Sequence, residues 1–342
     1  MPAPHVPVFY MPYPVEPPNP FLEEARQRLQ DWLVHHQLVT TREAWAQVER
    51  TRPDLMAARY YPKADRDALV RHMQWLAWGF VVDDEFDDGP AGRDPQQCQA
   101  VIRELSDAVA GGPVREPYAR ALVDLWQATV RDRSREWKRV HLHDFCTVLW
   151  TYHTETIGRV TGTQFTSLAE YIPFRCQSVA ILFYGADHAE AALGIDLPDF
   201  VRHLPALAAI RRLVCEHIGL LNDIFSVAKD RALNNSNAVD IVMAKRDCDQ
   251  AAALDHLNAL LTRKINDIAA HEAVLAGQLI AAGADGPTQE QVAACVAAYK
   301  ALTRGNHDWH FEVGRYTAPE AIHNGIPLYT QDLFARPPVS DR

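Results

Sequence analysis

The sequence lacks an uninterrupted apolar run of about 18 residues, the length that a helix needs to cross a bilayer, so no membrane span is expected. Its first twenty residues lack the basic and apolar regions of a signal peptide. The six cysteines are scattered, without a CxxC pair or the Cys/His spacing of a metal site. These absences predict a protein with reduced thiols that works in the cytoplasm.

Positive charge is also scarce. The chain has 34 Lys and Arg against 44 Asp and Glu, which leaves a net charge of −10. Because nucleic-acid binding needs a basic surface, an acidic chain is not expected to have nucleic acid as a partner. The balance does not exclude a small anionic ligand, which needs only local positive charge or metal ions.

Proline gathers near the two ends of the chain, and the middle is poor in proline and glycine. Apolar residues there recur every three or four positions, which predicts helices, and no run alternates with the period of two that a strand requires. The segment 67–82 is apolar nearly all round and is expected to be a buried central helix. About ten helices should form one all-α domain over residues 21–332, preceded by a proline-rich segment (1–20) and followed by a flexible tail (333–342). The main helical segments are 19–38, 67–82, 100–112, 116–132, 134–162, 167–193, 203–233, 249–283 and 288–316.

The stretch "VVDDEFDD" places five carboxylates directly after that apolar helix. Asp83 and Asp87 are one helical turn apart, with Asp84 beside them. Acidic residues at the C-terminal end of a helix oppose its dipole, so they destabilise the helix unless cations bind. Hard oxygen ligands with this spacing suit Mg²⁺. The alternative is a solvated acidic helix end.

A second polar set follows in "LLNDIFSVAKD". Asn222, Ser226 and Asp230 lie at i, i+4 and i+8, so an amide, a hydroxyl and a carboxylate share one face of an otherwise apolar helix. Taken alone, this ladder could be a hydrogen-bonded seam between helices. Together with the first acidic stretch it indicates a mixed-oxygen site for another Mg²⁺.

Four motifs, in this order and spacing, resemble those of class I terpene synthases, and the microbial cyclases in particular. "DDEFD" resembles the aspartate-rich motif, and "NDIFSVAKD" resembles the second metal motif of that family. "EYIPFR" is similar to the segment that ends in the diphosphate-sensing arginine, here Arg175, and "NHDWHFEVGRY" to the C-terminal Arg-Tyr motif, here Arg315 and Tyr316. "PYPVEPPNP" and "TETIGRVTG" are also of family type, so the resemblance covers nearly the whole chain.

The resemblance implies a class I terpenoid synthase bundle of helices around a central active-site cavity. It implies three Mg²⁺ ions, for which Mn²⁺ is a substitute. One departure is that the family usually has Glu where this chain has Asp230, whose side chain is one methylene shorter. The implied metal ligands are Asp83, Asp84, Asp87, Asn222, Ser226 and Asp230, and the implied catalytic, diphosphate-binding residues are Arg175, Lys229, Arg315 and Tyr316.

A carbocation needs an apolar, aromatic pocket, because the faces of aromatic rings stabilise positive charge. Ordinary core packing is the alternative for each aromatic candidate. Phe9, Tyr10 and Tyr13 could form a lid that excludes water, against the alternative of a disordered tail. The predicted pocket residues are Trp78, Phe80, Phe174 and Trp309, together with Ser178 and Val179 near the sensor arginine.

The resemblance therefore implies a Mg²⁺-dependent cyclase that converts a prenyl diphosphate, farnesyl diphosphate first, into a sesquiterpene hydrocarbon or alcohol. Geranylgeranyl diphosphate, which would make it a diterpene synthase, and geranyl diphosphate are the rival substrates. A chain-elongating prenyltransferase would have a second aspartate-rich motif in place of "NDIFSVAKD". A non-catalytic, cation-binding helical module is the alternative from another class. Homodimers are common in the family, but the residues themselves carry no signal for one, so the oligomeric state stays open between monomer and homodimer.

Overall fold

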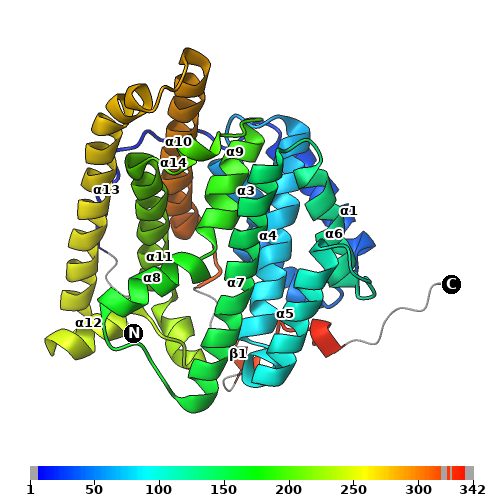
Figure 1. Ribbon diagram of the computed structural model, residues 1–342. Helices are drawn as coiled ribbons and strands as arrows, with labels where there is room; N and C mark the ends of the chain where they lie inside the picture. The colour runs from blue at the N-terminus through cyan, green and yellow to red at the C-terminus, as the bar shows by residue number, and fades with distance from the viewer. Residues whose placement is uncertain (1–6, 317–321, 324–325, 336–342) are drawn as a thin grey trace. The chain divides into compact units, whose positions relative to one another are not determined.

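The computed structural model describes residues 7–316, 322–323 and 326–335. Almost all of its regular structure is helical, which confirms the predicted all-α class (Figure 1). The chain groups into two compact units. The N-terminal unit comprises Pro17–Thr163 and Glu312–Arg342, and the C-terminal unit comprises Met1–Glu16 and Gln164–Phe311. The single domain expected over 21–332 stays a prediction.

The N-terminal unit is built around one long helix, α4 (Arg66–Asp87), as its apolar sequence predicts. The side chain of Asp65 accepts a hydrogen bond from the backbone of Ala68 at 2.8 Å and so caps the helix. Two indoles of α4 are buried and satisfied: Trp75 donates to Thr129 Oγ1 at 2.8 Å, and Trp78 donates to the Tyr118 carbonyl at 2.9 Å. The other helices of this unit are α1 (Leu22–His35), α2 (Arg42–Thr51), α3 (Pro53–Tyr60), the 3-10 turn η1 (Pro90–Arg93), α5 (Pro95–Val109), α6 (Pro117–Val130) and α7 (Arg135–Thr161).

The predicted helix over 134–162 is confirmed as α7. Ser134 caps its start by accepting from the backbone of Trp137 at 3.0 Å, and it ends at Gly162, where φ is 70°. Two short strands, β1 (Ile322–His323) and β2 (Ile326–Pro327), pair antiparallel, and the sequence has no period-two pattern that predicts them. The predicted tail begins with the 3-10 turn η4 (Leu333–Ala335), and its residues 336–342 lie outside the described part of the chain.

In the C-terminal unit, α11 (Pro205–Leu233) and α13 (Gln250–Ala281) pack side by side (Figure 1). Their buried leucines and isoleucines form a core with α12 (Ala238–Arg246). None of the helices within residues 7–316 combines the length and hydropathy needed to cross a bilayer. The remaining helices of this unit are α8 (Leu168–Ser178), the π-helix η2 (Leu182–Asp187), α9 (His188–Ala192), α10 (Asp199–Arg202) and α14 (Gly286–Glu312).

The prediction of one helix over 167–193 is wrong. The chain breaks after α8, where Ala180 takes a left-handed conformation with φ of 60°, and continues as η2 and then α9. A non-glycine residue in this region is strained, and neither Val179 nor Ala180 signals a break in the sequence. Beyond the break, η2 packs closely on α14, since a side chain at Gly185 would lie 2.8 Å from Leu302.

The last helix, α14, ends at Glu312, so the prediction that it runs to residue 316 is also wrong. Arg315 and Tyr316 lie in the turn that follows, where the backbone of Gly314 donates to the Arg50 carbonyl at 3.1 Å. At the other end of the chain, Phe9 is buried and packs against Phe225 of α11 within the C-terminal unit. Residues 1–6 of the predicted lid segment lie outside the described residues.

Candidate active site

The polar ladder of α11 is present in the C-terminal unit. Ser226 donates to Asp230 Oδ2 at 2.6 Å, so a hydroxyl and a carboxylate oxygen of two predicted ligands lie next to each other. Asn237 Nδ2 donates to the same carboxylate oxygen at 2.7 Å. The shorter side chain of Asp230 therefore still reaches its predicted neighbour in the ligand set. Lys229, one position before, is half-buried.

Arg175 of α8 lies directly against this ladder. Its Nη2 donates to Asn222 Oδ1 at 2.7 Å, its Nε to Asp223 at 2.8 Å and its Nη1 to Ser178 Oγ at 3.1 Å. The two helices approach closely because α11 has Gly219 at this point, where an added Cβ would lie 3.1 Å from Arg175 Cγ. The structure thus brings the predicted sensor arginine and a predicted metal ligand into contact.

Asp223 is a site residue that the sequence analysis missed. It is buried, and besides Arg175 it accepts from the backbone of Ala238 at 3.0 Å. Burial raises the pKa of its carboxyl although Arg175 lowers it. Its position directly after Asn222 could have identified it in the sequence. A carboxylate there can bind the arginine that also contacts Asn222.

The oxygen set of the ladder fits a hard divalent cation. Amide, hydroxyl and carboxylate oxygens are the donors that Mg²⁺ takes from proteins. Burial, and then the negative charge of Asp223, raise the pKa of Asp230 to about 6. A carboxylate that is difficult to ionise is stabilised by a nearby cation, so this site would gain from binding one.

In the N-terminal unit, Arg315 binds the first two predicted aspartates at the end of α4. Its Nη2 donates to Asp84 Oδ1 at 2.7 Å and to Asp83 Oδ2 at 3.3 Å. Asp84 is buried, whereas the side chain of Asp83 is 31% exposed and also accepts from the Tyr152 hydroxyl at 3.2 Å. Tyr316, beside Arg315, is half-buried.

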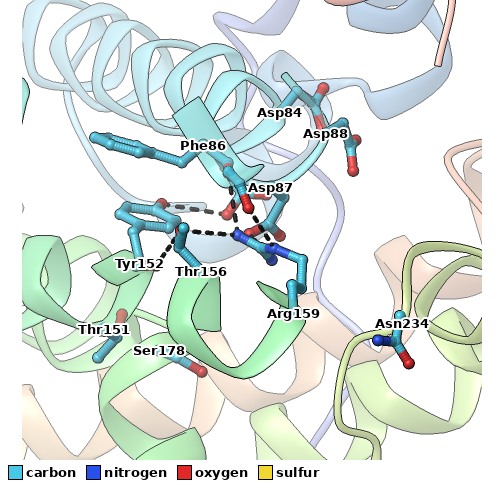
Figure 2. A network of polar contacts seen from close by, with 12 residues as sticks. Asp84, Phe86, Asp87, Asp88, Thr151, Tyr152, Thr156, Arg159, Ser178 and Asn234 are labelled. Atoms are coloured by element: carbon cyan, nitrogen blue, oxygen red, sulfur yellow. Dashed lines mark hydrogen bonds and ion pairs between the residues drawn. The ribbon is translucent and has the colours of Figure 1, made fainter. Parts of the chain in front are cut away.

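The third predicted aspartate, Asp87, is held by Arg159, which the sequence analysis did not single out. Figure 2 shows Arg159 reaching from α7 to the end of α4, where Nη1 donates to Asp87 at 3.1 Å and Nη2 to the Phe86 carbonyl at 3.1 Å. Its Nε donates to the Gly92 carbonyl at 3.0 Å. The available signal was a basic residue in "TETIGRVTG". A buried cation here offsets the acidic helix end that the sequence predicts to need one.

Each of the three predicted aspartate ligands of α4 therefore forms an ion pair with an arginine. Within the described ranges, no three Asp, Glu, His or Cys side chains are grouped so that they could hold a metal ion. Asp83 is the most accessible of the three predicted ligands, since the side chains of Asp84 and Asp87 are 9% and 16% exposed. The roles of all three as ligands stay predictions.

Glu85 and Asp88 hold the segment that follows the Arg-Tyr turn. Glu85 accepts from the backbones of Gln331 at 2.6 Å and Leu333 at 3.0 Å, and Asp88 accepts from the Tyr329 hydroxyl at 2.6 Å. The two remaining carboxylates of "VVDDEFDD" therefore bind the chain itself. Burial raises the pKa of Glu85 to about 7, although both backbone hydrogen bonds lower it.

Glu85 should make stability depend on pH. Its pKa in the folded chain, about 7, exceeds its ordinary value of 4.5, so the folded state binds the proton more tightly than the unfolded state. Stability is therefore expected to fall by about 3 kcal/mol as pH rises from 4.5 to 7, and to level off above 7. Urea unfolding at pH 5 and pH 8, without divalent metals, should show a smaller fall for Glu85→Gln. An identical fall in both proteins would refute this assignment.

The predicted aromatic pocket residues lie in different surroundings. Trp78 and Trp309 are almost wholly buried, and Trp309 packs against His310 with ring centroids 4.8 Å apart. Phe80 is half-buried, and the Cζ atom of Arg315 lies over its ring, 4.6 Å from the ring centroid. Phe80 also lines a small hollow of the N-terminal unit. Phe174 packs against Phe165 at 4.9 Å. Core packing accounts for the burial of Trp78. That any of these residues lines the substrate pocket stays a prediction.

Comparisons with known proteins agree with these motifs. A model of "Terpene synthase family 2, C-terminal metal binding" matches residues 74–267. The chain is 33% identical over 329 residues to (2Z,6E)-hedycaryol synthase of Kitasatospora setae, covering 95% of this chain and 96% of the relative. It is 26% identical over 332 residues, and 95% of each chain, to 7-epi-alpha-eudesmol synthase ((2E,6E)-farnesyl diphosphate cyclizing) of Streptomyces viridochromogenes. A solved structure of hedycaryol synthase in complex with nerolidol matches with a TM-score of 0.78 at 30% identity, covering 89% of this chain and 99% of that one.

Proposed function

Because the chain belongs to terpene synthase family 2, and is therefore a terpene synthase of the carbon–oxygen lyase type, we propose that it ionises farnesyl diphosphate and cyclises the resulting carbocation. The family membership confirms the predicted enzyme class and excludes a non-catalytic helical module. It also implies a prenyl diphosphate substrate and a divalent metal. The proposed product is a sesquiterpene hydrocarbon or alcohol.

The contact of Arg175 with the Asn222 ladder carries this proposal. A guanidinium, which binds phosphate oxygens, donates at 2.7 Å to an amide oxygen that is suited to a metal ion. Departure of diphosphate from an allylic carbon needs both kinds of group, because several negative charges develop on the leaving oxygens. Two relatives that match nearly the whole chain are named for sesquiterpene alcohols, and one name gives farnesyl diphosphate as the substrate. These names favour a substrate with fifteen carbons.

We assign the metal to two sets of residues. In the C-terminal unit, Asn222, Ser226 and Asp230 would hold Mg²⁺ through oxygen atoms. In the N-terminal unit, Asp83 is the first ligand, with Asp84 and Asp87 as further candidates. When bound, Mg²⁺ would act as a Lewis acid on the diphosphate oxygens. Three ions are proposed, and Mn²⁺ is the proposed substitute.

The chain's own cations would bind the leaving diphosphate. Arg175 and Arg315 can each present two parallel N–H groups to a phosphate, the Lys229 ammonium can donate up to three hydrogen bonds, and the Tyr316 hydroxyl can donate one. Both arginines donate to carboxylates in the present structure, Arg175 to Asp223 and Arg315 to Asp84. We infer that each arginine exchanges part of these contacts for the diphosphate. The carboxylates would then keep the guanidinium planes oriented.

The choice of substrate is tested by supplying geranyl, farnesyl and geranylgeranyl diphosphate separately, with and without Mg²⁺. Farnesyl diphosphate with Mg²⁺ is expected to give the fastest release of inorganic diphosphate. Gas chromatography with mass detection should find cyclic C15 products, and chelation of the metal should abolish them. A C20 product from geranylgeranyl diphosphate as the main activity would instead support the diterpene synthase. Release from none of the three substrates would contradict the proposal.

A further inference from the structure

His310, in the last turn of α14, lies against the first predicted ligand of the α11 ladder. Its Nδ1 is 2.8 Å from the Asn306 carbonyl, which can only accept, so Nδ1 carries a proton and donates. In the neutral ring, Nε2 is then an acceptor. Asn222 Nδ2 lies 3.3 Å from that Nε2 and donates to it. The ring is buried and packs on Phe225, with centroids 4.9 Å apart.

The two ends of the Asn222 amide thus meet partners of opposite kind. Its Nδ2 donates to His310, and its Oδ1 accepts from Arg175 Nη2 at 2.7 Å. An amide turned by 180° would direct N–H groups at the guanidinium and the oxygen at the imidazole lone pair, and both contacts would be repulsive. His310 and Arg175 therefore select the same orientation, which directs the oxygen toward the Arg175 side of α11.

The two contacts differ in what happens when a metal ion binds. The Arg175 contact uses the Asn222 oxygen, so a metal ion at that oxygen must displace it. The His310 contact uses the nitrogen and does not compete. We propose that His310 is a positioning residue that holds the Asn222 amide so that Oδ1 faces the divalent metal after Arg175 has turned to the diphosphate. This inference rests on the proposed metal role of Asn222.

A matched pair of substitutions separates this role from packing. Asn in place of His310 can still donate to the Asn306 carbonyl but has no acceptor at the Nε2 position. Gln in its place can reach that position with its side-chain oxygen. Calorimetry of Mn²⁺ binding in the presence of inorganic diphosphate is expected to show binding about 3- to 10-fold weaker for His310→Asn, the loss that one hydrogen bond predicts, and near wild type for His310→Gln. Equal losses for both variants would indicate packing alone and overturn the proposal.

An Asn222→Asp background provides the second test. Aspartate has nearly the same size and shape as asparagine, and its carboxylate presents an oxygen at both ends. Such a ligand needs no help with orientation. The loss caused by His310→Asn is therefore expected to shrink below about twofold in the Asn222→Asp background, because the coupled interaction is gone. The same loss in both backgrounds would overturn the proposal.

Asn222→Ala distinguishes failure of this inference from failure of the proposed site. If Asn222→Ala binds Mn²⁺ and diphosphate as the wild type does, the metal role of Asn222 is wrong, and the positioning role fails with it. If Asn222→Ala binds more weakly while His310→Asn binds normally, the site stands and the positioning role alone is wrong. Weaker binding in both, with His310→Gln restored, is the expected result.

Discussion

An Asp83→Asn variant is expected to release diphosphate from farnesyl diphosphate about 10²- to 10³-fold more slowly than the wild type in Mg²⁺. Asp83 is the most exposed of the three predicted aspartate ligands of α4, with 31% of its side chain accessible. Its contacts to Tyr152 and Arg315 are long, at 3.2 and 3.3 Å. Its oxygens are therefore the most available to a metal ion, and an amide would lose the negative charge that attracts one.

The matched control is Asp67→Asn in the first turn of the same helix. Asp67 is exposed and forms a surface ion pair with Arg28 at 2.7 Å, so its replacement should leave the rate unchanged. Asp87→Asn should reduce the rate less than Asp83→Asn, because Arg159 already neutralises Asp87 at 3.1 Å. Rates should be compared at saturating and at limiting Mg²⁺. An Asp83→Asn enzyme as fast as Asp67→Asn would remove Asp83 from the metal site.

The second large effect is expected on stability, from Arg211→Met. Arg211 is buried in the C-terminal unit and forms ion pairs with Asp187 and Glu190, the former at 2.7 Å. It also donates to the Tyr299 hydroxyl at 2.9 Å. Removing one partner of a buried ion pair leaves a charge without compensation, so the free energy of unfolding should fall by about 3–5 kcal/mol. Urea denaturation followed by circular dichroism measures this change.

Arg212→Met is the neighbouring control. The Arg212 side chain is 56% exposed, and its partner Glu216 keeps a second ion pair with Lys264, so the expected loss is about 0–1 kcal/mol. Adding Asp187→Asn to Arg211→Met should recover part of the larger loss, because it removes the charge of a carboxylate that pairs with Arg211, whereas Glu190 keeps its ion pair with Arg202 at 2.8 Å. Equal, small losses for Arg211→Met and Arg212→Met would show that the buried network does not stabilise the unit.

The buried network also explains why the helix break near the sensor arginine persists. Asp187 and Glu190 lie at the end of η2 and in α9, and Arg211 ties them to α11. The segment after Ala180 is thus held by charges on another helix. The sequence predicts one continuous helix here, because apolar residues recur with helical spacing on both sides of the break. Local spacing contains no information about Arg211, which is far along the chain.

The polar ladder of α11 can be predicted from the sequence because its residues are close together along the chain. Asn222, Ser226 and Asp230 are separated by four residues each, and one helix is enough to bring their side chains onto the same face. The 2.6 Å contact between Ser226 and Asp230 is local in the same sense. The sequence likewise predicts the order of the four motifs, the burial of α4 and the bounds of α7.

The helical class, most helix positions and the residues that share one helical face can therefore be predicted from the sequence, because these follow from spacing within a few turns. The partner of each charged group, in contrast, depends on how distant segments pack in the folded chain. Folding brings Arg315 to Asp84 and the Leu333 backbone to Glu85, pairs that are 231 and 248 positions apart. It also brings His310 against the nitrogen of Asn222, 88 positions away. Such contacts depend on how helices pack, and packing is set by the sum of many weak side-chain interactions that no single stretch of sequence contains.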